Sequence, residues 1–202
     1  MSVSYFLAII LCIFTLISCS SDQQDSNIIN LENDLQKGWQ EYNSGKYESA
    51  MLAFEKVLNE KPSLEISGDA YNGLGWSYLN KSQDMGVNQM NLTNALDKFH
   101  ETINQDKTNS DAWIGQACAF LVRKNNTDDF QNILKSIDNA QQGNNKYLYR
   151  HDYDSEADIH ALKAQCYYYL NKIEYAQNEI EHTLAIEKDN NVALAIKDLI
   201  DF

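Results

Sequence analysis

The chain has 202 residues, of which 29 are acidic and 16 are basic, so its formal net charge is −13. A chain with this charge repels phosphate backbones, and no cluster of lysine or arginine offsets it, so we exclude nucleic-acid binding. The sequence contains one proline and is rich in helix-forming residues, which predicts an all-α fold. Its length is enough for one domain with a sizeable core.

The N-terminal segment predicts export from the cytoplasm. An uncharged apolar run extends from Tyr5 to Ile17, and it is shorter than the roughly 20 residues that a membrane-spanning helix needs. The run fits the apolar region of a secretory signal peptide, which is removed from the mature protein. It ends in Leu16-Ile17-Ser18-Cys19, and a polar tract follows. Cys19 is therefore either incidental to an ordinary signal peptide or a site of chemical attachment.

Leu16-Ile17-Ser18-Cys19 resembles the lipobox of bacterial lipoproteins, in which an aliphatic, a variable and a small residue precede a cysteine. The resemblance implies that Cys19 receives a diacylglyceryl group, whose two acyl chains supply the anchoring that one chain cannot. We expect residues 1–18 to be the signal peptide, residues 19–30 the lipidated cysteine with a flexible tether, and residues 31–202 the folded domain. Ser20 stands where aspartate favours inner-membrane retention, which indicates the outer membrane, facing the periplasm.

Two segments share an Ala-x3-Phe pattern, at Ala50/Phe54 and Ala95/Phe99, and each follows a stretch with aromatic and small residues. The second stretch reads Tyr71-x2-Leu74-Gly75-x2-Tyr78. Together these spacings resemble the tetratricopeptide repeat (TPR), a helix–turn–helix unit of about 34 residues. A third and a fourth copy follow, with matching residues at Trp113, Ala117 and Phe120, and at Ala164, Tyr167, Ala176 and Ile180.

The resemblance implies an all-α, right-handed superhelical solenoid of about four such units with a C-terminal capping helix. Stacking is required because no single unit buries both of its apolar stripes. We expect the small residues of the first helices to permit close approach, and large residues of the second helices to fill the space between units. The small residues are Gly38, Gly75, Ala117 and Ala164, and the large ones are Phe54, Phe99 and Ile180. The second helix of unit three, about residues 128–141, lacks a clear Ala-x3-Phe. The expected apolar stripe of the capping helix is Val192, Ala195, Ile196, Leu199 and Ile200.

Extra residues at 81–91 and 141–157 separate the repeats. Solenoid insertions often gather on one face, where they bind ligands, but we favour the alternative of loop growth without function. The segment HDYDSEADIH, from His151 to His160, is the densest group of potential metal ligands. It lacks both the pattern of an EF-hand loop and the histidine spacing of a helical zinc site. We therefore interpret it as an acidic, solvated turn, with Asp158 near the start of the next helix.

The sequence carries no constellation for catalysis. It has neither a serine on a nucleophile elbow nor a glycine-rich phosphate loop, so we predict no enzymatic activity and no cofactor. Cys118 and Cys166 fall on the first helices of units three and four. A disulfide needs Cβ atoms within about 4.5 Å, so we favour two buried cysteines over a bridge.

The TPR resemblance implies that the first helices line a concave groove, which receives an extended peptide or a partner helix. Large amphipathic rings anchor many interfaces. The residues that we predict to form the partner-binding groove are Trp39, Tyr42, Asn72, Trp76, Tyr168 and Tyr169. Further candidates from the same projection are Leu35, Leu79, Ile114, Cys118, Leu121 and Gln165. We expect half of the combined set to be exposed.

Two function classes remain. The first is a lipid-anchored, non-enzymatic scaffold of the bacterial cell envelope, which binds an envelope protein or peptide in its concave groove. The second is a solute- or glycan-binding lipoprotein of nutrient uptake, because helical-repeat lipoproteins of that kind present aromatic rings to sugars. We favour the scaffold, since this chain is much shorter than those uptake proteins. The sequence does not predict the oligomeric state.

Overall fold

The computed structural model describes residues 28–83, 87–124, 126–144, 148, 151 and 153–200. The predicted signal peptide at 1–18 and Cys19 lie outside the described residues. Within them, the regular elements are helices joined by turns and loops. The first helix covers residues 28–43, and it is followed by α2 (Tyr47–Asn59), α3 (Leu64–Gln83), α4 (Gln89–Gln105), α5 (Ser110–Arg123), α6 (Thr127–Gln142), α7 (Glu156–Tyr169), α8 (Ile173–Ile186) and α9 (Asn191–Ile200).

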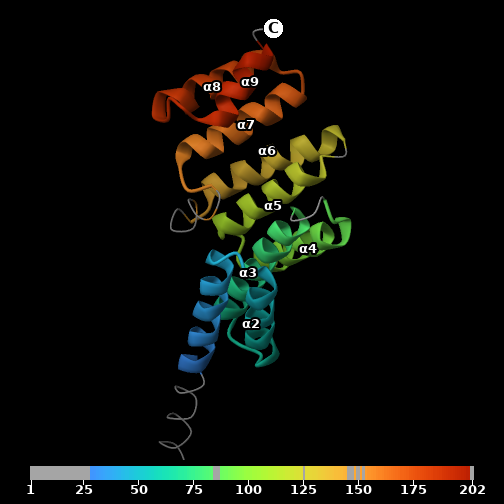
Figure 1. Cartoon of the computed structure of the whole chain (residues 1–202), viewed down its shortest axis with the longest axis vertical. Helices are drawn as coiled ribbons and strands as arrows, with labels where there is room; N and C mark the ends of the chain where they lie inside the picture. The colour runs from blue at the N-terminus through green and yellow to red at the C-terminus, as the bar shows by residue number, and fades with distance from the viewer. Residues whose placement is uncertain are drawn as a thin grey trace, which may run out of the picture.

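The helices pair into four helix–turn–helix units that stack along one axis (Figure 1). Unit 1 is the first helix with α2, unit 2 is α3 with α4, unit 3 is α5 with α6, and unit 4 is α7 with α8. Helix α9 packs on α7 and α8 at the end of the stack opposite the first helix. This arrangement confirms the predicted solenoid of TPR-like units with a C-terminal helix. None of the helices in the described part of the chain is long and apolar enough to cross a membrane.

Two phenylalanines lock the first three units together. Phe54 of α2 is fully buried and lies against Gly38 of the first helix and Gly73 of α3. A Cβ atom at Gly38 would come within 2.5 Å of the Phe54 ring, which is closer than van der Waals contact allows. Phe99 of α4 occupies the equivalent place one unit later. The predicted roles of Gly38, Phe54 and Phe99 are thus confirmed.

Phe99 lies between Gly75 of α3 and Gly115 of α5, and a Cβ atom at Gly75 would lie 2.6 Å from its ring. Each phenylalanine therefore needs two glycines, one on the first helix of its own unit and one on that of the next. Side chains on both sides of this interlock form a single core cluster that extends from the first helix into α7.

Unit 4 closes the stack with smaller residues. Ala164, Ile180, Ala193 and Ile196 form a separate buried cluster, with Tyr168, Leu184 and Ile200 packed against it. The predicted apolar stripe of the last helix is correct at Ile196 and Ile200, which belong to this cluster, and wrong at its other positions, because Ala193 is buried, whereas Val192 and Leu199 are 43% and 54% exposed. A stripe through positions 193, 196 and 200 follows the three- and four-residue spacing of one helix face.

Two predicted boundaries shift. Residues 28–30, which we assigned to the tether, are helical. Both ends of the 81–91 insertion are also helical, because α3 continues to Gln83 and α4 starts at Gln89.

The second helix of unit 3 is expected at about 128–141 and is observed at Thr127–Gln142. There Ile133 and Ile137 are fully buried in place of the alanine and phenylalanine of units 1 and 2.

Candidate binding groove

The first helices of units 1 and 2 bring four predicted groove residues to one place. Trp39 and Tyr42 come from the first helix, and Asn72 and Trp76 come from α3. They are joined there by His151, which belongs to the insertion between α6 and α7. Thus a loop residue that is distant in sequence lies on the side of the stack where we expected a partner.

The His151 ring is surrounded by aromatic side chains. It stacks on Trp39 with a centroid distance of 4.8 Å and an interplanar angle of 17°. The Tyr42 ring lies at 5.2 Å in a T-shaped arrangement with it, and Trp76 lies at 4.9 Å. The side chain of His151 is only 9% exposed. These contacts fix the imidazole ring between units 1 and 2.

A buried carboxylate completes this environment. Asp111, in the first turn of α5, is 1% exposed. Its Oδ2 accepts hydrogen bonds from Asn72 Nδ2 at 2.6 Å and from His151 Nε2 at 3.0 Å, and its Oδ1 accepts one from Trp76 Nε1 at 3.2 Å. Three donors satisfy a carboxylate that would otherwise be costly to bury. We call Trp39, Tyr42, Trp76 and Asp111 the His151 pocket.

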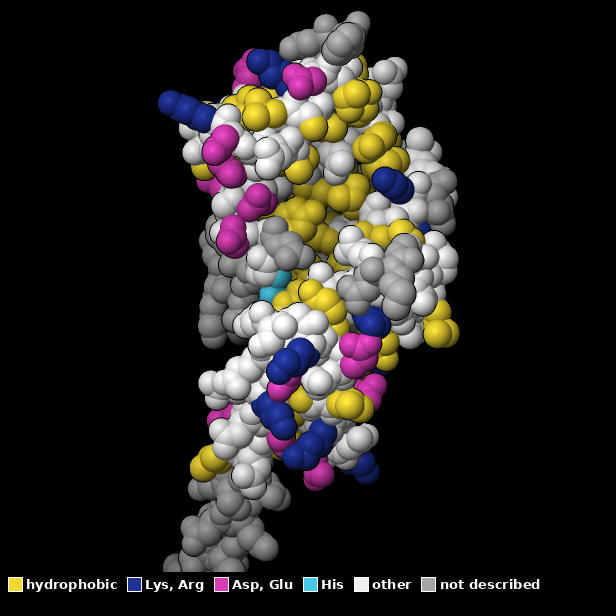
Figure 2. All heavy atoms as spheres, in the orientation of Figure 1, with side chains coloured by type: hydrophobic (Ala, Val, Ile, Leu, Met, Phe, Trp, Pro, Cys, Tyr) yellow, Lys and Arg dark blue, Asp and Glu magenta, His cyan; other side chains and the backbone are white. Residues whose placement is uncertain are grey.

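The pocket opens into a cavity of about 410 Å³, which is lined by Trp39, Asn43, Asp69 and His151. On the face that Figure 2 shows, hydrophobic side chains gather in a hollow at the middle of the molecule, whereas most charged side chains lie toward its two ends. The cavity beside the pocket therefore has two ring side chains, Trp39 and His151, and one acidic residue, Asp69, among the residues that line it.

The expected exposure of the groove residues is wrong. Of the twelve candidates, only Tyr169 is exposed, at 44%, while Trp76 is completely buried and Asn72 and Tyr42 are 1% and 7% exposed. Leu79, Ile114 and Cys118 are also buried, and the remaining candidates are partly buried. The physical reason at the pocket is the inserted loop, whose His151 covers Trp39, Tyr42 and Trp76.

Tyr168 and Tyr169 do not join the pocket. Tyr169 stacks on Phe130 of α6 at 4.9 Å, and Tyr168 packs against the cluster of unit 4. The two tyrosines meet edge-on at 5.6 Å. They therefore mark the junction between units 3 and 4, which is a different part of the stack.

The two histidines that begin and end the acidic segment from His151 to His160 lie in different parts of the structure. His151 faces the pocket, whereas His160 Nδ1 lies 2.5 Å from Glu179 Oε2 on α8 and its ring stacks on His182. Asp158 forms a capping box with Ser155 at the start of α7, which confirms its predicted place. Within the ranges that the structure describes, there is no group of three histidine, cysteine or acidic side chains suited to a metal ion.

The prediction for the two helical cysteines is confirmed, since Cys118 and Cys166 are both buried and no disulfide joins them. Burial raises the pKa of the Cys166 thiol to about 12, so this thiol stays protonated at physiological pH.

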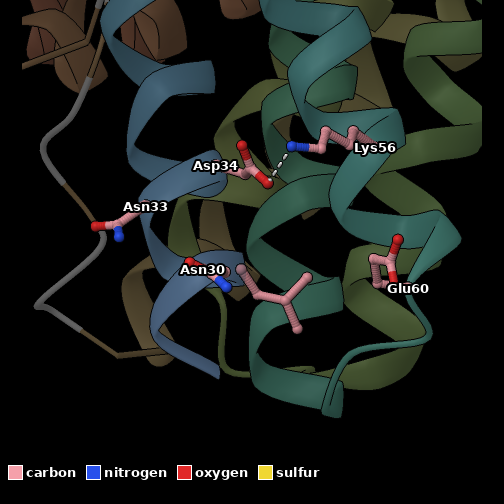
Figure 3. A pocket seen from close by; sticks show the side chains of 6 residues that line it. Asn30, Asn33, Asp34, Lys56 and Glu60 are labelled. Carbon is pink, nitrogen blue, oxygen red and sulfur yellow. Dashed lines mark ion pairs between the residues drawn. The ribbon is translucent and has the colours of Figure 1, made fainter. Parts of the chain in front are cut away.

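Figure 3 shows another recess of about 410 Å³, between the first helix and α2. Asp34 and Lys56 point toward each other across it, and Lys56 Nζ lies 2.7 Å from Asp34 Oδ2. Lys56 is 64% exposed, so water reaches this ion pair and weakens it. The recess has polar walls and, among the described residues, no buried polar group that awaits a ligand, so we favour the His151 pocket as the functional site.

Sequence reasoning found the aromatic walls of the pocket but missed Asp111 and the role of His151. An acidic residue in the first turn of a helix ordinarily indicates only a favourable interaction with the helix dipole. One sequence feature could have indicated a buried acceptor such as Asp111. A tryptophan follows a glycine in two successive units, and a buried indole N–H requires an acceptor.

Comparisons with known proteins bear on the fold. No protein-family model matches the chain, and no curated protein matches it. Among solved structures, it is similar to the crystal structure of a thermophilic TPR protein from Thermus thermophilus, with a TM-score of 0.55 and 19% identity. The match covers 78% of this chain and 75% of that chain. The helical stack, the interlocking residues and this similarity together show that the chain has the fold of a TPR protein.

Proposed function

We propose that this chain is a lipid-anchored, non-enzymatic scaffold of the bacterial cell envelope, which holds a protein or peptide partner in the groove of its first helices. The observation that carries the proposal is the His151 pocket. Three aromatic rings and a carboxylate, drawn from three stacked units, already hold a side chain from a segment outside the repeat helices. A surface that binds one polypeptide side chain in this way has the chemistry to bind another. The TPR fold supports the same class of function.

The proposed anchor is a diacylglyceryl group on Cys19, with the polar tract after it as the tether and the outer membrane, facing the periplasm, as the location. Support comes from the sequence Leu16-Ile17-Ser18-Cys19 after an apolar run. Because the chain carries a net charge of −13, electrostatic attraction to anionic lipid does not favour the membrane, and the acyl chains supply the binding.

The anchor is tested by replacing the cysteine in the full-length chain. Cys19→Ala should abolish incorporation of labelled palmitate and release the protein from membranes or leave its signal uncleaved. Cys12→Ala, which changes a cysteine within the apolar run, is the matched control and should behave as the parent. Membrane retention of Cys19→Ala, together with an unlipidated parent, would refute the lipoprotein assignment.

The partner is tested by site-specific photo-cross-linking in intact cells. A photoreactive residue at position 43, on the wall of the cavity, should capture a discrete envelope protein. The same residue at position 52, which is 69% exposed on α2 and does not line the cavity, is the control. Equal capture from both positions would contradict the proposal that the partner binds in the groove. Binding of a glycan without a protein partner would instead support the uptake lipoprotein.

A further inference from the structure

We infer that the His151 pocket recognises an arginine side chain of a partner polypeptide, and that His151 is a built-in competitor for this site. The inference deepens the proposed function and rests on it, since it names the chemistry that the groove binds. It comes from the composition of the pocket, from the charge at its mouth and from the conformation of the loop that fills it.

The walls of the pocket suit a flat cation. Trp39 stacks face to face on the imidazole at 4.8 Å, and Trp76 and Tyr42 contact its other sides at 4.9 and 5.2 Å. The face of a tryptophan ring such as Trp39 attracts cations through the ring quadrupole, and arginine is the cation found most often in this role. The planar guanidinium group also stacks on aromatic faces, as the imidazole does here.

The hydrogen-bonding groups of the pocket suit arginine better than histidine. His151 reaches the Asp111 carboxylate through one nitrogen, Nε2. A guanidinium group carries five N–H donors and pairs with a carboxylate through two of them. Asn72 adds a further acceptor, because its Oδ1 is buried and has no hydrogen-bond partner among the described residues, although its Nδ2 donates to Asp111. A ligand with several donors would satisfy more of these acceptors than the imidazole does.

The charge at the mouth of the pocket favours the same ligand. Of the described residues that line the cavity, Asp69 is acidic and His151 is the one with a basic side chain. The buried carboxylate of Asp111 lies next to this cavity, 3.0 Å from Nε2 of His151. A cationic side chain therefore approaches an acidic recess on a chain whose net charge is −13, which favours association by electrostatic attraction.

His151 itself has the features of a displaceable occupant. His151 adopts a φ of 57°, in the left-handed region that residues other than glycine rarely occupy. The side-chain contacts of His151 must therefore offset an unfavourable backbone. Leu148 is 6% exposed in the core cluster and Tyr153 packs against it, so His151 stays tethered near the pocket when its side chain leaves. A tethered occupant of this kind competes with any partner at a high effective concentration.

The experiment empties the pocket in the full-length chain and supplies small probes. His151→Gly removes the imidazole and allows the positive φ without strain. Asn171→Gly is the matched control, because Asn171 also has a positive φ, of 56°, at the turn between α7 and α8. The probe is N-acetylarginine methylamide, and its neutral analogue N-acetylcitrulline methylamide keeps the planar shape without the charge. Binding is followed by tryptophan fluorescence, since two of the three tryptophans line the pocket.

We expect His151→Gly to bind the arginine probe at least about tenfold more tightly than the parent and Asn171→Gly, because the tethered competitor has been removed. The citrulline probe should bind His151→Gly about tenfold more weakly than the arginine probe, and adding Asp111→Asn should lower arginine binding to the citrulline level. Equal affinities of His151→Gly and Asn171→Gly, or of the two probes, would overturn the inference.

Circular dichroism shows whether the variants keep their helices. If His151→Gly loses helicity, His151→Ala, which keeps the ordinary backbone restriction, is held to the same expectations. These measurements use purified protein without membrane or partner. A negative result therefore removes the arginine site but leaves the scaffold to the cross-linking test. Conversely, if the probe binds but no partner is cross-linked, the arginine site would be supported and the scaffold function would be refuted.

Discussion

Units 2 and 4 fill the same space between helices in two different ways. In unit 2, the large ring of Phe99 is fully buried against Gly75 and Gly115. In unit 4, the equivalent position on the second helix is Ile180, which is 4% exposed, and the small residue on the first helix is Ala164. A larger side chain thus meets glycine, and a smaller one meets alanine. The comparison shows that the two positions are matched in volume, as close packing requires.

The two solutions have different consequences for cooperativity. The phenylalanines of units 1 and 2 belong to one core cluster that includes residues of α5, α6, α7 and the loop at Leu148. Ile180 belongs to a separate small cluster shared with α9. In a repeat protein, stability is approximately a sum over units and their interfaces. We therefore expect α8 and α9 to open at lower free energy than units 1 to 3.

The largest effect should come from removing a phenylalanine of the shared core. Phe99→Ala should lower the free energy of unfolding by about 3–5 kcal/mol, because it leaves a cavity between two units. Ile180→Ala should cost about 2 kcal/mol, near the lower end for such truncations, and should act locally. Native-state hydrogen exchange separates the two, since Phe99→Ala should reduce protection in units 1 to 3 and Ile180→Ala in α8 and α9 only.

Leu52→Ala is the control for this pair, because Leu52 is apolar but 69% exposed and its loss should change stability by less than about 0.5 kcal/mol. If Ile180→Ala reduced protection in α3 and α5 as strongly as in α8, the two clusters would be one cooperative core.

A smaller effect should follow from adding one methyl group to the interlock of unit 2. Gly75→Ala should destabilise the chain by about 1–3 kcal/mol, because its Cβ would lie 2.6 Å from the Phe99 ring. Gly68→Ala is the matched control in the same helix. Its Cβ would meet only Gln105 Oε1, at 3.6 Å, so it should stabilise the chain by up to about 1 kcal/mol through helix propensity.

The matched volumes can be tested directly by giving unit 2 the residue pair of unit 4. Gly75→Ala with Phe99→Ile should cost less than the sum of the two single changes, with a coupling of about 0.5–3 kcal/mol in urea unfolding. Additive costs would mean that Ala164 and Ile180 are not the counterparts of Gly75 and Phe99, and the comparison of the units would fail.

The sequence predicted the repeat positions well because they depend on local helical spacing. Gly38, Gly75, Phe54 and Phe99 were all found by their offsets within a unit. Their counterparts Gly73 and Gly115 were missed, although they form the opposite walls of the same sockets. A repeat pattern identifies which residues a unit buries, but it does not show which residue of the next unit they contact.

The candidate site was predicted less well, because it depends on a long loop. Trp39 and Trp76 were correctly placed in one region, but their predicted exposure is wrong since His151 covers them. Helical periodicity contains no information about where an insertion packs, and the favoured interpretation of the 141–157 insertion was loop growth without function. The role of Asp111 cannot be predicted from spacing, because its partners come from unit 2 and from this insertion, and only the stacked fold brings them together.

The smallest effect concerns the start of α7, where the inserted loop rejoins the repeat. Ser155 and Asp158 form a reciprocal capping box, in which Ser155 Oγ accepts from Asp158 N at 3.2 Å and Asp158 Oδ2 accepts from Ser155 N at 3.1 Å. At the start of α3 in unit 2, Ser63 Oγ is 3.5 Å from Ile66 N and is exposed, so it is a much weaker cap. Ser155→Ala should therefore cost about 1 kcal/mol, and Ser63→Ala only a few tenths. Urea unfolding of the two variants measures this difference, and equal losses would mean that the capping box does not hold the end of the loop in solution.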